Sequence, residues 1–218
     1  MLQIVIPTCN AAEPLSRLLA QVSGERVIVS DSGSDDDTLR VAVEAGAVVA
    51  AGKPGRGSQL KLGAELAVMR GGAGDWFLFL HADSVLPIGW REDVARAMEG
   101  TAPRYFPLSF GAPGFQPWLM EKLVAFRNLG WALPYGDQGL LVSRADYLAC
   151  GGYPDWPLFE DVDIAQRLTG LRPMRGHIRT DVGKYEAEGY WARGLRNYRL
   201  LRDFRRGVSP HELAERYQ

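Results

Sequence analysis

Four short segments combine acidic, basic or imidazole side chains at spacings that could support chemistry. In the first, residues 76–83 (WFLFLHAD), an apolar run ends in His81 and Asp83. Residues two apart in an extended chain lie on the same side, so these two side chains can act together. A diphosphate bound through Mg²⁺ or Mn²⁺ needs few protein carboxylates. The segment indicates a metal site at a strand end; the alternative is that Asp83 caps the turn that follows.

The second segment, residues 157–163 (PLFEDVD), places three carboxylates at the predicted start of a helix. Glu160, Asp161 and Asp163 follow aromatic and apolar residues. Neighbouring like charges and burial can raise a carboxyl pKa toward the working pH that a general base requires. The alternative is that the acids cap the helix and complement its dipole.

The third segment, residues 31–38 (DSGSDDDT), follows a predicted strand and precedes a predicted helix. Gly33 permits a tight backbone turn between Ser32 and Ser34, and the Asp31 carboxylate could bind ribose hydroxyls or base N–H groups. The same residues could equally cap the helix. The two interpretations are compatible.

The fourth segment, residues 53–61 (KPGRGSQLK), is a glycine-rich loop that carries cations into the start of a helix. Arg56 and Gln59 could there contact a diphosphate or a base. The loop is not a Walker A motif, because no Gly-Lys-Ser/Thr follows. A solvated basic loop is the alternative.

Alternating strand and helix patterns would position these segments. We expect strands at residues 2–6, 26–30, 47–50, 76–80, 103–110 and 139–142, and helices at residues 14–22, 38–45, 59–69, 118–131, 162–168, 187–206 and 210–217. The alternation predicts an α/β fold with a mostly parallel sheet and helices on both faces. Ligands bind such sheets at the carboxyl ends of the strands. The polar segments after residues 6, 30, 50 and 80 should therefore meet in one crevice.

Composition excludes several classes of protein. The chain has 218 residues, with 25 Lys and Arg against 26 Asp and Glu, and its net charge of -1 argues against a nucleic-acid-binding protein. Cys9 and Cys150 are too few for a disulfide framework, which favours a reduced, cytoplasmic protein. The sequence predicts neither a signal peptide nor a membrane-spanning segment.

Arginines recur near the C-terminus beside aromatic residues. They are Arg193, Arg196, Arg199, Arg202, Arg205 and Arg206. One interpretation is an ordinary solvated helix face. The alternative is peripheral contact with an anionic membrane surface, or with a phosphorylated acceptor carrier.

The ordered set of segments resembles the family 2 glycosyltransferases of the GT-A fold. The resemblance rests on IVIPTCNAAEPLSRLL, VIVSDSGSDDDT, GRGSQLKLGAELA, WFLFLHADSVLP and YGDQGLLVSRADYLACGGYPDWPLFEDVDIAQRL. The sequence is most similar to the small bacterial branch called radical-SAM/selenodomain-associated glycosyltransferases. The resemblance implies a Rossmann-like three-layer sandwich forming one domain over residues 1–218. Residues 1–100 would bind the nucleotide sugar, and residues 101–218 would supply the catalytic base and bind the acceptor.

This resemblance also implies a reaction and assigns roles to residues. The reaction would be an inverting transfer of a sugar from a UDP- or GDP-sugar to the hydroxyl of a lipid-linked or small acceptor. Asp161 of the Glu160-Asp161 pair would be the base. Asp83 would bind Mg²⁺ or Mn²⁺, with His81 in place of the first acid of the Asp-x-Asp motif. The nucleotide-binding residues would be Pro7, Thr8, Glu13, Asp31, Ser32, Gly33, Ser34, Arg56 and Gln59. The sugar or acceptor would contact Tyr135, Asp137, Gln138 and Trp156. The location would be cytoplasmic, at most peripheral to the inner membrane face.

Three other classes remain as alternatives. A nucleotidyltransferase would also bind a metal and a diphosphate, but a glycine-rich loop is expected after its first strand, and residues 7–12 contain no glycine. A haloacid-dehalogenase-like phosphatase needs a nucleophilic acid where His81 stands. A nucleotide-sugar-binding protein without catalysis is consistent with His81, whereas the Glu160-Asp161 pair argues against it.

Overall fold

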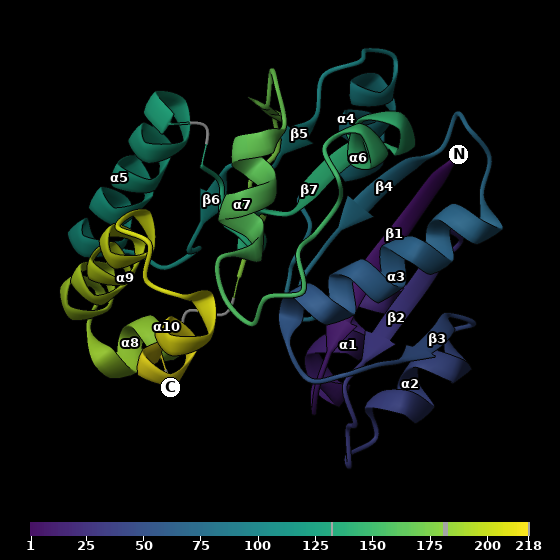
Figure 1. Cartoon of the computed structure of the whole chain (residues 1–218), viewed down its shortest axis with the longest axis horizontal. Coiled ribbons are helices and arrows are strands. Elements are labelled where there is room, and N and C mark those ends of the chain that lie inside the picture. Colours follow the sequence, from purple (N-terminus) through teal and green to yellow (C-terminus); the bar gives the residue numbers. More distant parts are fainter. Residues whose placement is uncertain (132, 181–182, 218) are drawn as a thin grey trace.

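Strands and helices alternate along the first half of the chain. The computed structural model describes residues 1–131, 133–180 and 183–217. Its main sheet has the strand order β3-β2-β1-β4-β7-β5-β8, and β6 pairs with β9 in a separate ribbon (Figure 1). The strands are β1 Leu2–Thr8, β2 Arg26–Asp31, β3 Val48–Ala51, β4 Trp76–Phe79, β5 Arg104–Tyr105, β6 Leu108–Ser109, β7 Leu140–Ser143, β8 Arg172–Pro173 and β9 Ile178–Arg179.

Helices cover both faces of this sheet. They are α1 Ala12–Gln21, α2 Thr38–Glu44, α3 Arg56–Arg70, α4 Trp90–Met98, α5 Phe115–Trp131, α6 Arg144–Ala149, α7 Glu160–Arg167, α8 Gly183–Glu188, α9 Tyr190–Arg205 and α10 Pro210–Tyr217, with a 3₁₀ turn, η1, at Gly136–Gln138. Strands β1 to β4 are mutually parallel, whereas β7 runs antiparallel to both β4 and β5. The predicted α/β class with a mostly parallel sheet is confirmed.

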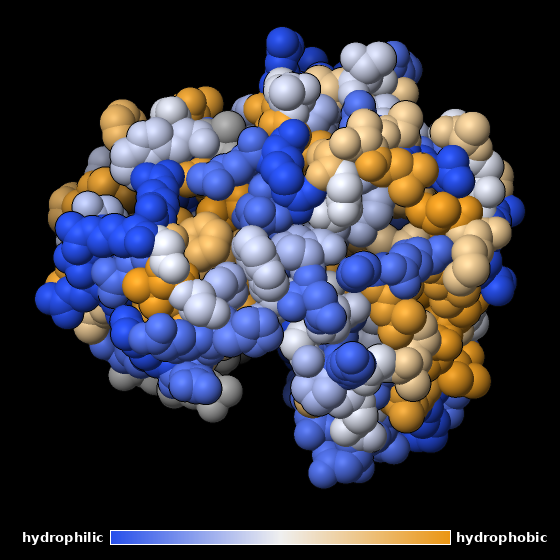
Figure 2. All heavy atoms as spheres, in the orientation of Figure 1, coloured by the Kyte–Doolittle hydropathy of each residue, from blue (hydrophilic) through white to orange (hydrophobic). Residues whose placement is uncertain are grey.

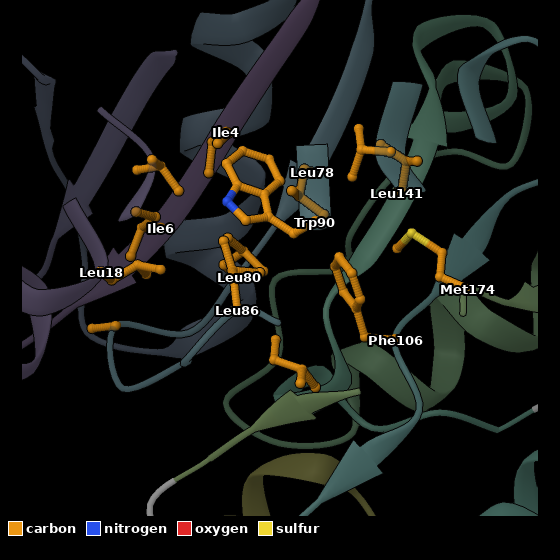
Figure 3. Close-up of a cluster of buried hydrophobic side chains, with 14 of the residues drawn as sticks. Ile4, Ile6, Leu18, Leu78, Leu80, Leu86, Trp90, Phe106, Leu141 and Met174 are labelled. Atoms are coloured by element: carbon orange, nitrogen blue, oxygen red, sulfur yellow. The ribbon is translucent and has the colours of Figure 1, made fainter. Parts of the chain in front are cut away.

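Two apolar cores lie on opposite faces of the sheet. Ile4 and Leu78 pack with α1 and α4 on one face, and Val5 and Phe77 pack with α3 and α6 on the other. Successive strand residues point to opposite faces, so one short apolar strand supplies both cores. Figure 3 shows the first core, in which the ring of Trp90 lies beside the aliphatic side chains of β1 and β4. The result is the three-layer arrangement that the pattern predicts.

The first strand runs further than expected. β1 continues through Pro7 to Thr8, which pairs in register with Asp31 at the end of β2. The carbonyl of Val5 faces β4, and Pro7, two residues on, faces the same side beyond the end of β4. The missing N–H of proline therefore costs no ladder hydrogen bond there. Thr8 and Asp31 consequently lie side by side at the carboxyl edge of the sheet.

In the second half, one predicted strand is wrong and one predicted helix begins later than expected. The single strand expected at residues 103–110 is two short strands in two sheets. Between them, the N–H of Phe106 donates to Gln138, and Pro107 has no N–H to donate. The helix expected at residues 187–206 is present as α9, but it begins only after Gly189, whose φ of 84° is outside the helical region, and residues 187 and 188 belong to the end of α8.

A third apolar cluster attaches the C-terminal helices to the rest of the fold. Phe159 and Val162, around the start of α7, pack with Leu200 of α9 and Leu213 of α10. This cluster places α9 and α10 against the segment that the sequence singled out for its carboxylates. Within the described residues, no helix combines the length and apolar character that crossing a bilayer requires.

Candidate active site

A pocket of about 200 Å³ lies where the end of β4, η1 and the start of α7 meet. From that side it is lined by Arg56, His81, Asp83, Tyr135, Gly136, Asp137, Leu158, Phe159 and Asp161, and from the C-terminal side by Thr180, Tyr185, Arg193, Asn197, Leu200 and Tyr217. Six of the residues predicted from sequence for metal, base, nucleotide or sugar contacts therefore share one cavity.

Asp161 is held at the N-terminus of α7 by backbone donors. Its Oδ2 accepts a 2.6 Å hydrogen bond from the N–H of Gly136, and its Oδ1 accepts one of 2.7 Å from the N–H of Val162. Phe159, before the helix, has a left-handed φ of 63°, and its ring stacks on Phe204 at 4.9 Å. Buried packing thus maintains a strained backbone that aims the carboxylate into the pocket.

Glu160 lies behind Asp161 and is fully buried. Its Oε1 accepts a hydrogen bond from Nε of Arg56, the guanidinium of which also reaches Asp161, with Nη2 3.9 Å from Oδ2. Burial raises the pKa of Glu160 although the charge of Arg56 opposes that shift. Burial disfavours the charge of Arg56, but the two carboxylates outweigh it and raise the pKa of the guanidinium. Glu160 is placed to hold Arg56 rather than to meet a substrate.

His81 presents a neutral imidazole to the pocket. Burial, followed by the charge of Arg56, lowers the pKa of His81 to about 3. Its Nε2 is buried and has no hydrogen-bond partner among the described residues. A Cβ added to Gly136 would come within 2.7 Å of that nitrogen, so only glycine permits this approach. His81 therefore brings an unpaired ring nitrogen beside the turn that holds Asp161.

Asp137 is a second carboxyl of unusual pKa in the same cavity. Burial raises the pKa of Asp137 to about 6, with a further increase from Asp161 and an opposing effect of Arg127. Arg127, on α5, lies with its guanidinium 3.5 Å from the ring centre of Tyr135. The pocket thus holds three aspartates, including Asp83, whose Oδ2 accepts a 3.4 Å hydrogen bond from Thr180.

Gln138 supports this turn from below and does not line the pocket. The side chain is fully buried, and its Oε1 accepts hydrogen bonds from Asn128 at 3.0 Å and from Arg127 at 3.1 Å. Its Nε2 donates to the carbonyl of Phe106 at 3.2 Å. Gln138 fixes η1, and through η1 the N–H of Gly136.

Most of the predicted nucleotide-binding residues form a separate cluster at the ends of β1 and β2, whereas Arg56 lines the pocket and Glu13 lies on α1. Asp31 Oδ2 accepts 2.8 Å hydrogen bonds from the N–H groups of Gly33 and Ser34, and its Oδ1 accepts from the hydroxyls of Ser34 and Thr8. Burial alone would raise the pKa of Asp31, but these hydrogen bonds outweigh it and lower the pKa. Ser32 donates its N–H to the carbonyl of Thr8 at 3.1 Å.

Gln59 joins the two strand ends from α3. Its amide donates to the carbonyl of Thr8 at 2.6 Å and to the carbonyl of Ser30 at 2.9 Å. Pro7 is buried in β1. The amide nitrogen of Gln59 is thus already used within the protein, and the Pro7 ring is packed inside the fold.

Two predicted site residues lie apart from the rest. The Glu13 side chain is 83% exposed and pairs with Arg17 at 2.6 Å on α1. The carbonyl of Trp156 accepts a 3.0 Å hydrogen bond from the N–H of Gly57 at the start of α3, while its ring packs on Phe204. Neither side chain lines the pocket.

Several pocket residues carried no signal in the sequence. Gly136 supplies a backbone N–H, which no residue type announces. Arg193 and Asn197 of α9 were visible only as part of an arginine-rich helix. Arg193 is buried, with Nη1 2.7 Å from Glu188 and Nη2 3.0 Å from the hydroxyl of Tyr217. The periodicity of a helix does not reveal which of its faces closes a cavity.

The donor set fits a divalent cation that is shared with a diphosphate. In the described residues no three His, Cys, Asp or Glu side chains converge as a complete metal site. Mg²⁺ and Mn²⁺ bound to substrate phosphates need only one or two protein ligands. The unpartnered Nε2 of His81 and the Asp83 carboxylate, both in the pocket, provide donors of that kind.

Comparison with known proteins identifies the family. The family model described as "Glycosyl transferase family 2" matches residues 3–123. The chain belongs to glycosyl transferase family 2. This match confirms the family that the sequence segments resemble and identifies the protein as a glycosyltransferase. No curated protein matches the chain.

Solved structures match the fold of this glycosyltransferase. One is glucosyl-3-phosphoglycerate synthase from Mycobacterium tuberculosis in complex with Mn²⁺, UDP and glucosyl-3-phosphoglycerate, with a TM-score of 0.55 and 20% identity; the match covers 88% of this chain and 76% of that one. The same enzyme with Mg²⁺ and UDP gives a TM-score of 0.56 at 19% identity, over 88% and 75%. TarS residues 1–349 from S. aureus give 0.62 at 16% identity, over 85% of this chain and 62% of TarS. At these identities the likeness establishes the GT-A fold.

Proposed function

We propose that the chain transfers a sugar from a UDP-sugar to a hydroxyl acceptor with inversion, and that Asp161 is the general base. The observation that carries the proposal is the fixed Asp161 carboxylate, which the N–H of Gly136 orients at 2.6 Å toward a pocket that also holds Asp83. An oriented carboxylate within a pocket is what an inverting transfer requires of its base.

The reaction needs one proton transfer and one displacement. The acceptor oxygen attacks the anomeric carbon, and its proton passes to Asp161. The bond from the anomeric carbon to the diphosphate oxygen breaks, and its electron pair leaves with UDP. Glu160 acts indirectly in this scheme, because it holds Arg56 beside Asp161, where the guanidinium would meet the donor phosphates.

Donor binding is assigned to residues 1–100, and acceptor binding with catalysis to residues 101–218. The cluster of Thr8, Asp31 and Ser34 would receive the nucleoside, and Arg56 the diphosphate. Tyr135, Asp137 and the carbonyl side of Trp156 would border the sugar or acceptor. UDP is preferred over GDP because solved relatives of the same fold are described with UDP.

Asp83 and His81 would hold Mg²⁺ or Mn²⁺, which would offset the negative charge of the diphosphate. The pocket holds three aspartates, and their negative charge would repel the donor diphosphate. A bound cation would offset that repulsion. A neutral His81 adds a donor without adding a fourth negative charge.

Four predictions from the sequence are not tested by the structure or by the matches to known proteins, and they stay predictions. They are the radical-SAM/selenodomain-associated branch, the cytoplasmic location, the peripheral membrane contact of the arginine-rich helix, and the choice between a lipid-linked and a small acceptor. The family match favours glycosyl transfer over nucleotidyl transfer. A chain that binds nucleotide sugars without turning them over is the remaining alternative.

Isothermal titration calorimetry with UDP and GDP, with and without Mn²⁺, tests the donor assignment. We expect UDP to bind more tightly with Mn²⁺, and Asp83→Asn to remove most of that gain. Asp163→Asn is the matched control, because Asp163 pairs with Arg167 on α7 and does not line the pocket. Metal-independent UDP binding, or equal losses in the two variants, would contradict the assignment of Asp83.

A further inference from the structure

Exposed apolar side chains concentrate on α5 and α9, two neighbouring helices of residues 101–218, which we call the C-terminal lobe. Among the described residues, fifteen large hydrophobic side chains are exposed, and nine of them lie on α5 and α9. They are Phe115, Trp118, Leu123, Phe126, Leu129 and Trp131 of α5, and Trp191, Leu195 and Tyr198 of α9. We call these nine residues the aromatic face. The two helices contact each other and lie together at one end of the molecule (Figure 1).

The charges that accompany the aromatic face have one sign. The exposed charged residues of α5 and α9 are Lys122, Arg199, Arg202 and Arg205, and the exposed Arg206 follows α9. No exposed residue of these two helices, both fully described, is acidic. Glu121 and Asp203, the acids of α5 and α9, are partly buried and accept hydrogen bonds, Glu121 from the N–H of Phe110 and Asp203 from Arg202.

Aromatic and cationic groups on this surface are in contact. The Arg205 guanidinium lies 4.9 Å from the ring centre of Trp131, and the Lys122 ammonium lies 5.8 Å from that of Trp118. Figure 2 shows apolar and strongly hydrophilic side chains adjoining over this lobe. Nine large apolar side chains exposed to water on two adjacent helices form a larger apolar surface than soluble proteins usually expose without a binding partner.

We propose that the aromatic face, with its arginines and lysine, binds the surface of an anionic lipid bilayer. Tryptophan and phenylalanine favour the boundary between lipid headgroups and acyl chains, while arginine and lysine interact with anionic headgroups. The exposed charges of α5 and α9 themselves are all positive, which is complementary to such a bilayer, while the exposed acids Glu188, Glu212 and Glu215 lie on the adjoining helices α8 and α10. The face differs from the sequence-based prediction, because α5 supplies most of its apolar residues and α9 most of its charge.

Docking in this way places the pocket beside the lipid headgroups. α9 exposes Trp191 and Leu195, and it also lines the pocket with Arg193, Asn197 and Leu200. One helix therefore borders both the aromatic face and the cavity. Vesicle binding itself needs no turnover, so the proposal stands or falls independently of the proposed glycosyl transfer.

Co-sedimentation with unilamellar vesicles tests the proposal. We expect binding to phosphatidylcholine vesicles that contain 30% phosphatidylglycerol, and much weaker binding to pure phosphatidylcholine. Each arginine near an anionic surface contributes about fivefold to the partition coefficient. Arg199→Glu/Arg206→Glu should therefore lower binding at least ~25-fold, and Trp118→Ser/Phe126→Ser should lower binding to the same vesicles.

Matched controls come from exposed residues in other parts of the fold. Met69 and Ile88 are 74% and 105% exposed, so Met69→Ser/Ile88→Ser controls for loss of apolar surface. Arg70→Glu/Arg175→Glu controls for charge reversal, since both arginines are exposed outside α5 and α9. Thermal unfolding and UDP binding should be unchanged in all four double variants, because none of these residues lines the pocket.

Three outcomes would overturn the proposal. The first is equal binding to neutral and anionic vesicles, or to neither. The second is an equal loss in the control and test variants. The third is a dimer in light scattering that Trp118→Ser/Phe126→Ser dissociates, since the face would then be covered by a second copy.

Discussion

The strand-end cluster around Asp31 and the pocket around Asp161 are both rich in polar groups, but they use them differently. Both oxygens of Asp31 accept hydrogen bonds, and the Gln59 amide donates to two backbone carbonyls. Two residues that line the pocket differ in this respect: Nε2 of His81 and Oδ1 of Asn197 are buried, and within the described part of the chain neither has a hydrogen-bond partner.

We interpret the cluster around Asp31 as a structural scaffold and the pocket around Asp161 as the reactive site. A buried polar group without a partner costs about 1–3 kcal/mol, and folding tolerates that cost where function requires it. In the strand-end cluster both oxygens of Asp31 are already paired, and among the described residues Oγ of the neighbouring Ser30 is the buried side-chain atom there without a partner. The pocket contains buried polar atoms that no described residue pairs with. We interpret these unpaired atoms as groups that bind the substrate or take part in the reaction.

Asp161→Asn should have the largest effect. Replacing a general base lowers turnover by about 10²–10⁴-fold, while donor binding should change little because the Gly136 hydrogen bond can persist. The measurement is UDP release from a UDP-sugar with water as acceptor. Asp163→Asn, two residues along the same helix, is the control and should keep its turnover. Equal rates in the two variants would remove Asp161 from the mechanism.

Arg56→Met should cost about 2–3 kcal/mol of folding stability in urea unfolding without nucleotide. It leaves the fully buried Glu160 carboxylate without its partner, and the figure is moderated because Arg56 is one-third exposed. Adding Glu160→Gln to that variant should restore most of the loss, because the unpaired buried charge is gone. A double variant no more stable than the single one would show that the pair is not the cause.

Asp137 should make stability depend on pH. The folded protein raises the pKa of Asp137 from 3.8 to about 6, so the folded state binds this proton more tightly than the unfolded chain. Its stabilising contribution is complete below pH ~4 and is lost as the pH rises through ~6. Relative to wild type, Asp137→Asn should gain about 1–2 kcal/mol between these limits, less than the full shift because the pocket admits water. A difference that stays constant from pH 4 to 7.5 would contradict this.

Glu13→Gln should have the smallest effect. The carboxylate is solvated and pairs only with Arg17 on its own helix, so stability should change by less than about 0.5 kcal/mol. Any contact with the nucleotide would be screened, and UDP affinity should fall less than about threefold. A larger loss in calorimetry would place Glu13 within the donor site and extend the strand-end cluster.

The sequence predicted the first half of the fold well because its signals are local. Buried strands such as β4 are continuous apolar runs, and the acids at their ends lie where parallel topology requires. The second half depends on contacts between distant residues. The carbonyl of Gln138 receives the N–H of Phe106 and divides a predicted strand, an interaction over 32 residues that no periodicity reveals.

The candidate site is predictable from sequence where it depends on a reactive side chain, and not where it depends on the backbone. His81, Asp83 and Asp161 are reactive types at recognisable positions, and they share the pocket. The contribution of Gly136 is a backbone N–H and the absence of a Cβ, neither of which residue type reveals. Glu160 is predicted as catalytic together with its neighbour; the structure shows it fully buried against Arg56, which is the basis of the positioning role that we propose for it.

The anomeric configuration of the first product tests the central proposal most directly. An α-linked UDP-sugar, chosen as the tightest binder in calorimetry, is incubated with the protein and water as acceptor, and ¹H NMR follows the released sugar before mutarotation. A single displacement with Asp161 as base predicts that the β-anomer appears first. If the α-anomer appears first, the transfer retains configuration, and the assignment of Asp161 as the base of an inverting reaction is wrong.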